Sequence, residues 1–235
     1  MVVPSPPENM REGPPPAWHG HLARASQGRP GPAVRGFPHG RDARETHGRD
    51  AHATSHASPD VVTAYVAAGS NIQPRRNIAE ALRLLRGAVQ VAGVSTFYRT
   101  PAIGPDGRVR AGDEEFLNGV FAVRTDLPAR RLKFEVLRPI EDRLGRVRSA
   151  DKYAPRTIDL DVVLYGSEVM DEPGLKLPAD DIRRPWVALP LRQLAGDVPL
   201  PGSGECLACL WSGPPPEGMV ADLEFTRLLR EICTT

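Results

Sequence analysis

From Val62 onward, apolar and polar residues repeat with two different periods, which predict an alternation of strands and helices. An apolar run rich in β-formers predicts a strand from Val62 to Ala68, ended by the turn Gly69-Ser70-Asn71. Apolar residues at helical spacing predict a helix from Arg75 to Val89. Two further apolar runs predict strands at Val91 to Tyr98 and at Phe116 to Thr125.

The same order of elements then continues. Leu127-Pro128 opens a second predicted helix, because proline suits a first turn, and Gly145 lies near its expected end at about Leu144. Pro139 predicts a kink or an early break in this helix, because proline cannot donate a backbone hydrogen bond. A fourth strand is predicted from Ile158 to Tyr165. The order β-α-β-β-α-β indicates a ferredoxin-like α+β fold, an antiparallel sheet with helices on one face.

The pattern is weaker beyond Gly166. Loops punctuated by proline lead to a predicted helix from Pro185 to Ala195, and Ala221 to Ile232 could form a terminal helix. We treat these elements as C-terminal additions to the fold, within one domain that covers residues 61–235.

Residues 1–60 differ in composition from this domain. The segment is rich in Pro, Gly, Arg and His and poor in aliphatic residues, so it cannot bury enough apolar surface to offset its ordering, and we expect disorder. Its charges are mixed, which argues against a nucleic-acid-binding arm. Alternatively, residues 1–60 do not belong to the native protein and translation starts at Val61 or Val62, because Val codons can start translation in bacteria.

All six histidines lie before Val61, which narrows the chemistry open to the domain. The domain therefore cannot use a histidine base, a Ser-His-Asp triad or a histidine-ligated zinc site. The sequence has no apolar run long enough for a membrane span or a secretory signal. Its three cysteines form no disulfide framework, and Cys206 and Cys209 make a lone CxxC. We therefore expect a cytoplasmic enzyme whose carboxylates and arginines carry the chemistry.

Asp159 and Asp161 are the most informative pair. Successive strand side chains point to opposite faces, so the two carboxylates share one face and Ile158, Leu160 and Val162 share the other. Cα atoms two residues apart on a strand are roughly 6.5–7 Å apart, close enough for two carboxylates to hold hard cations together. The upstream arginines would add positive charge, as a polyphosphate-transferring enzyme requires. A solvated strand face with ordinary surface ion pairs is the alternative.

Five separated motifs occur in the order and approximate spacing of one protein family. They are Ala67-Ala68-Gly69-Ser70-Asn71, Ser95-Thr96-Phe97-Tyr98-Arg99-Thr100-Pro101, Phe116-Leu117-Asn118, Gly145-Arg146-Val147-Arg148 and Pro155-Arg156-Thr157-Ile158-Asp159-Leu160-Asp161. By these motifs the chain resembles the 6-hydroxymethyl-7,8-dihydropterin pyrophosphokinases of folate biosynthesis. The resemblance covers about residues 61–200 and implies the ferredoxin-like fold. It also implies transfer of pyrophosphate from ATP to the hydroxymethyl group of the pterin, with release of AMP.

The resemblance assigns roles in the reaction to residues of this sequence. Asp159 and Asp161 resemble the ligands of two Mg²⁺ ions, and Arg146 and Arg156 resemble the catalytic arginines that neutralise the migrating group. The nucleotide-binding positions it implies are Arg138, Glu141, Arg148, Tyr153, Ile158 and Arg184, with Arg148 as an auxiliary phosphate contact. Loops Gly104 to Glu114 and Arg148 to Tyr153 would close over the substrates and exclude water.

The pterin pocket follows in the same way. A flat heterocycle calls for aromatic faces and for an amide that reads its hydrogen-bonding edge. The positions that resemble this pocket are Thr100, Pro101, Ile103, Gly104, Phe116, Asn118 and Trp186. Without the resemblance, Phe116 would be assigned to a strand core and Trp186 to helix packing. Gly69-Ser70-Asn71 lacks the length and the Lys of a phosphate loop, and we expect it to turn and cap the first helix beside this pocket.

Three positions depart from the usual family pattern. Ala179 stands where a nucleotide-contacting histidine is usual, Phe116 replaces a tyrosine and Tyr153 replaces a tryptophan. Two other functions remain open: a ligand-binding module without catalysis, and a kinase that transfers only the γ-phosphate. For the pyrophosphokinase function that the resemblance implies, we expect ATP and the pterin as partners, no nucleic acid, no membrane and a monomer.

Overall fold

The computed structural model describes residues 60–110, 112–149, 151 and 153–234. The tail expected to be disordered lies outside these residues, apart from Asp60. The elements in chain order are β1 (Val62–Ser70), α1 (Pro74–Ala88), β2 (Gln90–Val94), β3 (Tyr98–Thr100), β4 (Phe116–Thr125), α2 (Ala129–Arg131), a π-helical segment (Leu132–Leu137), α3 (Arg138–Arg143), β5 (Asp159–Tyr165), β6 (Met170–Glu172), β7 (Leu175–Leu177), α4 (Pro185–Ala195), a 3₁₀ turn (Leu207–Cys209), β8 (Val220–Ala221) and α5 (Leu223–Thr234).

The fold is mixed α and β and is built on an antiparallel sheet. The strands follow the order β5-β1-β4-β3-β8, and β2 also pairs with β4. β1 is central: it pairs with β4 from Val62↔Thr125 to Ser70↔Leu117, and with β5 on its other side. The predicted strands at 62–68, 116–125 and 158–165 are confirmed within two residues at each end.

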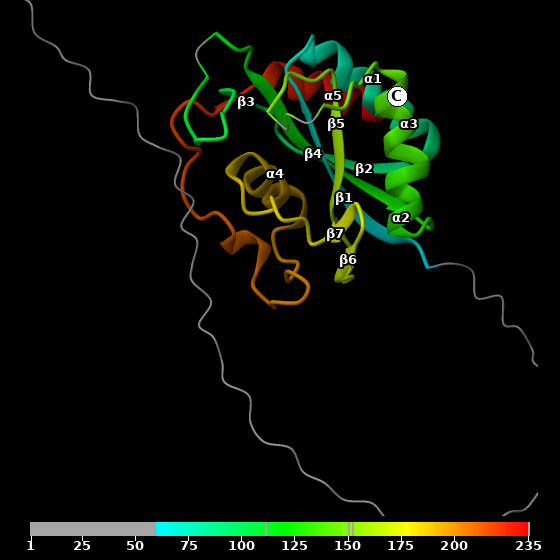
Figure 1. Cartoon of the computed structure of the whole chain (residues 1–235). Coiled ribbons are helices and arrows are strands. Elements are labelled where there is room, and N and C mark those ends of the chain that lie inside the picture. Colours follow the sequence, from blue (N-terminus) through cyan, green and yellow to red (C-terminus); the bar gives the residue numbers. More distant parts are fainter. Residues whose placement is uncertain (1–59, 111, 150, 152, 235) are drawn as a thin grey trace, which may run out of the picture. The chain divides into compact units, whose positions relative to one another are not determined.

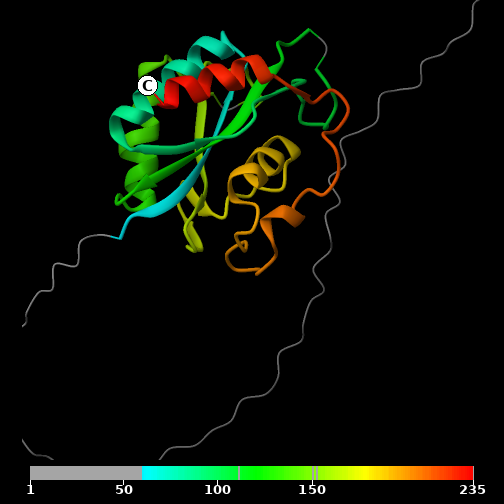
Figure 2. The ribbon, with the colours of Figure 1, turned by 180° about the vertical axis from the view of Figure 1, so that it is seen from behind.

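Both faces of this sheet are covered, which corrects the expectation of helices on one face. Ala64 and Val66 of β1 pack in the larger core with apolar residues of α1, the π-helical segment and α5. Tyr65, between them in the strand, points the other way and packs with Val187 and Leu191 of α4. Figure 1 shows α4 lying apart from the other helices, and Figure 2 shows α5 running alongside α1. The sheet lies between these two layers because its strands are apolar on both faces.

The predicted strand from Val91 to Tyr98 is two strands. Its middle leaves the ladder at Ser95, whose hydroxyl accepts a hydrogen bond from the Val120 N–H at 2.8 Å. Phe97 is completely buried, and its N–H donates to the Thr226 hydroxyl of α5 at 2.9 Å. The interruption therefore places Phe97 in the core and ties β3 to the C-terminal helix.

The predicted second helix is continuous from Ala129 to Arg143, but its middle is π-helical. The Arg138 N–H donates to the carbonyl of Lys133, five residues earlier. Pro139 has no N–H to donate, and its ring would crowd the carbonyl four residues before it in an α-helix. The wider turn accommodates Pro139 without breaking the helix, and Gly145 follows the helix with φ 72°, as its position predicts.

The remaining C-terminal elements add to the edges of this core. β6 and β7 form a short hairpin in a region predicted as loops. β8 pairs with β3 before α5 begins, so the terminal helix starts at Leu223 rather than at Ala221. Within the ranges that the structure describes, there is no helix with the length and apolarity that a membrane crossing requires.

Candidate active site

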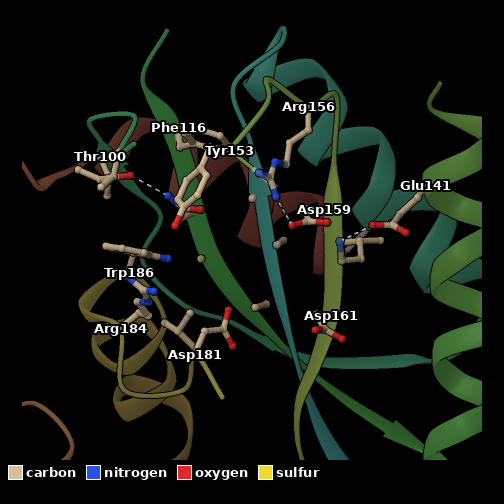
Figure 3. Close-up of a pocket in the computed structure, with 18 of the residues that line it drawn as sticks. Thr100, Phe116, Glu141, Tyr153, Arg156, Asp159, Asp161, Asp181, Arg184 and Trp186 are labelled. Atoms are coloured by element: carbon tan, nitrogen blue, oxygen red, sulfur yellow. Dashed lines mark hydrogen bonds and ion pairs between the residues drawn. The ribbon is translucent and has the colours of Figure 1, made fainter. Parts of the chain in front are cut away.

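A pocket of about 450 Å³ opens on the α4 face of the sheet, where β1 ends and β4 and β5 begin (Figure 3). Fifteen of the seventeen sequence-predicted site residues line it, although they come from six separated segments. They are Thr100, Pro101, Ile103, Gly104, Phe116, Asn118, Arg138, Glu141, Arg148, Tyr153, Arg156, Asp159, Asp161, Arg184 and Trp186. The volume is within the usual range for small-molecule sites.

Asp159 and Asp161 share one face of β5, as the alternating pattern predicts. Ile158 and Leu160, on the other face, are 0% and 4% exposed, whereas the two carboxylate side chains are 41% and 45% exposed toward the pocket. The described residues contain no cluster of three metal-ligating side chains. A pair of carboxylates nevertheless fits Mg²⁺, because this ion keeps several waters and takes one or two carboxylates together with substrate phosphates.

Two arginines hold the Asp159 carboxylate from different sides. Arg156 Nη1 lies 2.7 Å from Oδ2, and Arg146 Nη2 lies 3.4 Å from Oδ1. Both guanidinium side chains are largely buried. Burial lowers the pKa of Arg146, partly offset by the negative charge of Asp159. The Nε atom of Arg146 is buried without a hydrogen-bond partner among the described residues. The two arginines therefore bring concentrated positive charge to one side of the pocket.

The opposite end of the pocket is aromatic. Phe116 and Trp186 point into it from β4 and from the first turn of α4, and Tyr153 enters from the loop after α3 (Figure 3). Asn118 lies on the same face of β4 as Phe116, and its Nδ2 donates to the Thr100 hydroxyl at 2.8 Å. This hydrogen bond fixes the amide where a flat ring between the aromatic side chains would present its edge.

The motif Gly69-Ser70-Asn71 has a different role from the predicted helix cap. The residue before α1 is Gln73, which makes no side-chain capping bond. Ser70 and Asn71 instead hold the segment after α3: Asn71 Oδ1 accepts from the Arg156 N–H at 2.7 Å, and the Ser70 hydroxyl donates to the Thr157 carbonyl at 2.5 Å. These side chains are used for a partner far along the chain and are not free to cap a helix.

Glu141 anchors the outer side of β5. Its side chain is 1% exposed, its Oε1 accepts from the Leu160 N–H at 2.9 Å, and its Oε2 accepts from Arg148. Because β5 is an edge strand, this bond satisfies a donor that the sheet leaves unpaired. Burial is the main cause that raises the pKa of Glu141, and the Leu160 hydrogen bond opposes it.

The two loops expected to close over the substrates touch each other. Arg110 of the first loop donates to the Tyr153 carbonyl of the second at 3.4 Å and lies 4.0 Å from the Asp151 carboxylate. Arg110 also pairs with Asp113 within its own loop at 3.0 Å. One arginine therefore connects both loops at the mouth of the pocket.

Two predicted residues do not line the pocket. Arg146 reaches the site through its contact with Asp159. The Ile158 side chain is fully buried in the core on the other face of the sheet, so the predicted nucleotide contact of Ile158 falls to its backbone. Its position next to Asp159 in the strand dictates this, because neighbouring side chains point to opposite faces.

The pocket lining also includes Lys133 and Asp181, which the sequence does not single out, and Gly69, which the sequence places in the turn beside the pterin pocket. Lys133 Nζ lies 2.5 Å from Asp161 Oδ1, and its side chain is 12% exposed. Asp181 is open to the solvent of the pocket, yet desolvation and then repulsion from Asp161 raise the pKa of its carboxyl. Gly69 lies against Asn118, because a Cβ there would be 2.7 Å from the amide oxygen. The Asp180-Asp181 pair is a local signal for Asp181 and the Gly69-Ser70-Asn71 motif is one for Gly69, whereas no local feature of the sequence marks Lys133.

Comparison with known protein families places this geometry in context. Residues 65–196 match the sequence profile of the 7,8-dihydro-6-hydroxymethylpterin-pyrophosphokinase family. A 2-amino-4-hydroxy-6-hydroxymethyldihydropteridine pyrophosphokinase of Pseudomonas aeruginosa is 38% identical over 159 residues, which cover 66% of this chain and 93% of the relative. The enzyme of the same name from Haemophilus influenzae is 33% identical over 147 residues, covering 61% and 88%.

A solved structure supports the fold alone. The A437G variant of Plasmodium falciparum HPPK-DHPS, crystallised with SDX-DHP, superposes with a TM-score of 0.51 at 12% identity. The superposition covers 70% of this chain and 49% of that one, so the chain spans about half the length of this structural relative.

Proposed function

Because the chain belongs to the 7,8-dihydro-6-hydroxymethylpterin-pyrophosphokinase family, we propose that its pocket holds ATP and a pterin together and carries out the family's reaction. The protein is an ATP-dependent pyrophosphokinase of folate biosynthesis, which transfers pyrophosphate from ATP to 6-hydroxymethyl-7,8-dihydropterin and releases AMP. One observation carries the assignment of the site: the acidic pair of β5 and the aromatic end of β4 open into the same pocket.

The aromatic end binds the pterin. Phe116 and Trp186 cover the faces of the ring, and the Asn118 amide bonds to its edge. Asn118 is suited to this role because the hydrogen bond to Thr100 and the contact with Gly69 leave it one orientation. Pro101, Ile103 and Gly104 complete this end of the pocket.

The acidic end holds the phosphates of ATP. Asp159 and Asp161 would hold two Mg²⁺ ions, which supply positive charge to the polyphosphate. Arg156 and Arg146 neutralise the charge that develops on the migrating group, and both are already directed at this point by Asp159. Arg156 also lies over the Phe116 ring, 5.5 Å from its centroid, so it contacts both ends of the pocket. It is therefore placed to align the attacking hydroxyl with the phosphate.

The nucleotide lies toward α3 and the loops. Arg138 and Arg148 line that part of the pocket and provide cations for ATP, while Tyr153 and Arg184 reach the nucleotide from the aromatic end, where Arg184 lies 5.4 Å from the centroid of the Trp186 ring. Ala179 is buried against the α4 layer, so the histidine usual there has no counterpart in contact with nucleotide. The contacts between the two loops exclude water, which matters because ATP hydrolysis is the competing reaction.

The proposal extends to the fold classification, the location in the cell and the oligomeric state. The strand order and the packing of α1 and α3 against the larger core support a ferredoxin-like classification, with α4, β8 and α5 added to it. A cytoplasmic, monomeric enzyme remains our prediction from the sequence.

Product analysis tests the function directly. Purified protein should form AMP from ATP only when both the pterin and Mg²⁺ are present. ADP as the product would indicate γ-phosphate transfer, and pterin binding without any nucleotide product would indicate a binding module. Either result would overturn the proposed assignment.

A further inference from the structure

The two carboxylates proposed as metal ligands have different counter-ions. Asp159 is held by two arginines, whereas Asp161 is held by Lys133, whose Nζ lies 2.5 Å from Oδ1. Lys133 comes from the helix beside β5 and not from the loop that supplies the arginines.

The helix holds Lys133 firmly in this position. Leu132 and Leu137, on either side of it in the π-helical segment, are completely buried, and the Lys133 side chain is only 12% exposed. The Lys133 carbonyl accepts the π-type hydrogen bond from Arg138. Glu141, eight residues later, anchors the same helix to β5 through the Leu160 N–H. The backbone of Lys133 is therefore held in place, on a helix that is itself anchored to β5.

An ammonium in this position competes directly with a metal ion. It takes up a lone pair of the oxygen that a metal would need, and it repels a divalent cation at close range. Mg²⁺ also gives up its waters reluctantly, so one neutralised carboxylate weakens its binding further.

We propose that Lys133 is a positioning residue that keeps divalent metal off Asp161 until nucleotide arrives, so that metal and ATP enter the site together. This inference rests on the proposed function for the acidic pair. The negative charges of bound ATP can form an ion pair with the Lys133 ammonium in place of Asp161. The Asp161 carboxylate is then free to bind the metal. The binding of metal without ATP is disfavoured, and the binding of each strengthens that of the other.

The test measures Mn²⁺ binding to the full chain without nucleotide, by the paramagnetic resonance signal of free Mn²⁺. A unit charge near a carboxylate commonly changes its proton affinity by one to three powers of ten, so Lys133→Met should bind Mn²⁺ at least about tenfold more tightly than the unaltered protein. Lys133→Arg keeps the charge and should restore weak binding.

The chain offers a matched control in Lys176. Its Nζ also lies 2.5 Å from a carboxylate oxygen, that of Asp180, but both side chains are well exposed and neither lines the pocket. Lys176→Met makes the same change in net charge and should leave Mn²⁺ affinity unchanged. An equal gain in this variant would show a general charge effect and overturn the inference.

Further variants and a nucleotide analogue, in the same Mn²⁺-binding measurement, test whether the effect acts through Asp161. The double variant Lys133→Met with Asp161→Asn should lose the gain, and a gain that persists would place the effect away from Asp161 and overturn the inference. In the unaltered protein, α,β-methylene-ATP should strengthen Mn²⁺ binding more than it does in Lys133→Met. Lys133→Gln provides a second neutral variant should methionine impair folding. If neither neutral variant binds Mn²⁺ more tightly while the unaltered protein still forms AMP, this inference fails and the proposed function stands.

Discussion

Gly69→Ala is the sharpest single test of the pterin end of the pocket. A Cβ at this position would lie 2.7 Å from Asn118 Oδ1, several tenths of an ångström inside ordinary van der Waals contact. The amide must retreat, and its 2.8 Å hydrogen bond to Thr100 must lengthen or break. One or two misplaced hydrogen bonds to a buried ligand edge cost about 1–3 kcal/mol. This corresponds to a pterin Kd about 5- to 150-fold weaker.

Titration calorimetry with the pterin, in the presence of a non-hydrolysable ATP analogue, measures this change. Gly87→Ala is the matched control, because a Cβ at this exposed position of α1 meets nothing within 4 Å. It should leave pterin affinity unchanged and stabilise the helix by about 0.5–1 kcal/mol. Unaltered pterin affinity in a folded Gly69→Ala variant would refute the role given to Asn118.

Three further predictions concern the acidic pair, the core and a buried acid. Asp159→Ala or Asp161→Ala should lower AMP formation by orders of magnitude with an unchanged circular dichroism spectrum, and near-normal turnover by either would contradict the metal assignment. Gly119→Ala would place a Cβ 2.6 Å from the Phe97 ring, so thermal unfolding should show a loss of about 1–3 kcal/mol, and an unchanged Tm would count against this packing. Burial raises the pKa of Glu141 above its ordinary 4.5, so the folded state binds its proton more tightly and stability should fall as pH rises from 4.5 through the folded-state pKa. Urea unfolding of Glu141→Gln should show a shallower pH dependence, and a profile parallel to that of the unaltered protein would contradict it.

The predictable parts of the fold are those with a local cause. Alternation in β5 fixed the faces of Asp159 and Asp161, because the period of side chains in a strand is two residues regardless of neighbours. The helix at Pro185–Ala195 was predicted with its observed bounds, since proline at its first turn and apolar spacing mark it. Pro139 was recognised as a disturbance, but its outcome as a π-helical segment depends on packing against the sheet.

The parts that escaped prediction depend on distant partners. Ser70 and Asn71 look like a helix cap until the backbone of Arg156 and Thr157 is brought beside them. Lys133 is 28 residues from Asp161, and no spacing rule connects a helix position to the edge strand that follows it. Gly69 is likewise explained by Asn118, its partner across two paired strands.

The central claim is that the acidic pair and the aromatic pocket act together in pyrophosphoryl transfer. The most direct measurement is the nucleotide product of the purified protein, resolved by ion-exchange chromatography, with and without the pterin and with and without Mg²⁺. The account predicts AMP in an amount equal to the pterin diphosphate formed, and only when both the pterin substrate and Mg²⁺ are present. Formation of ADP, or AMP release that is independent of the pterin, would contradict it.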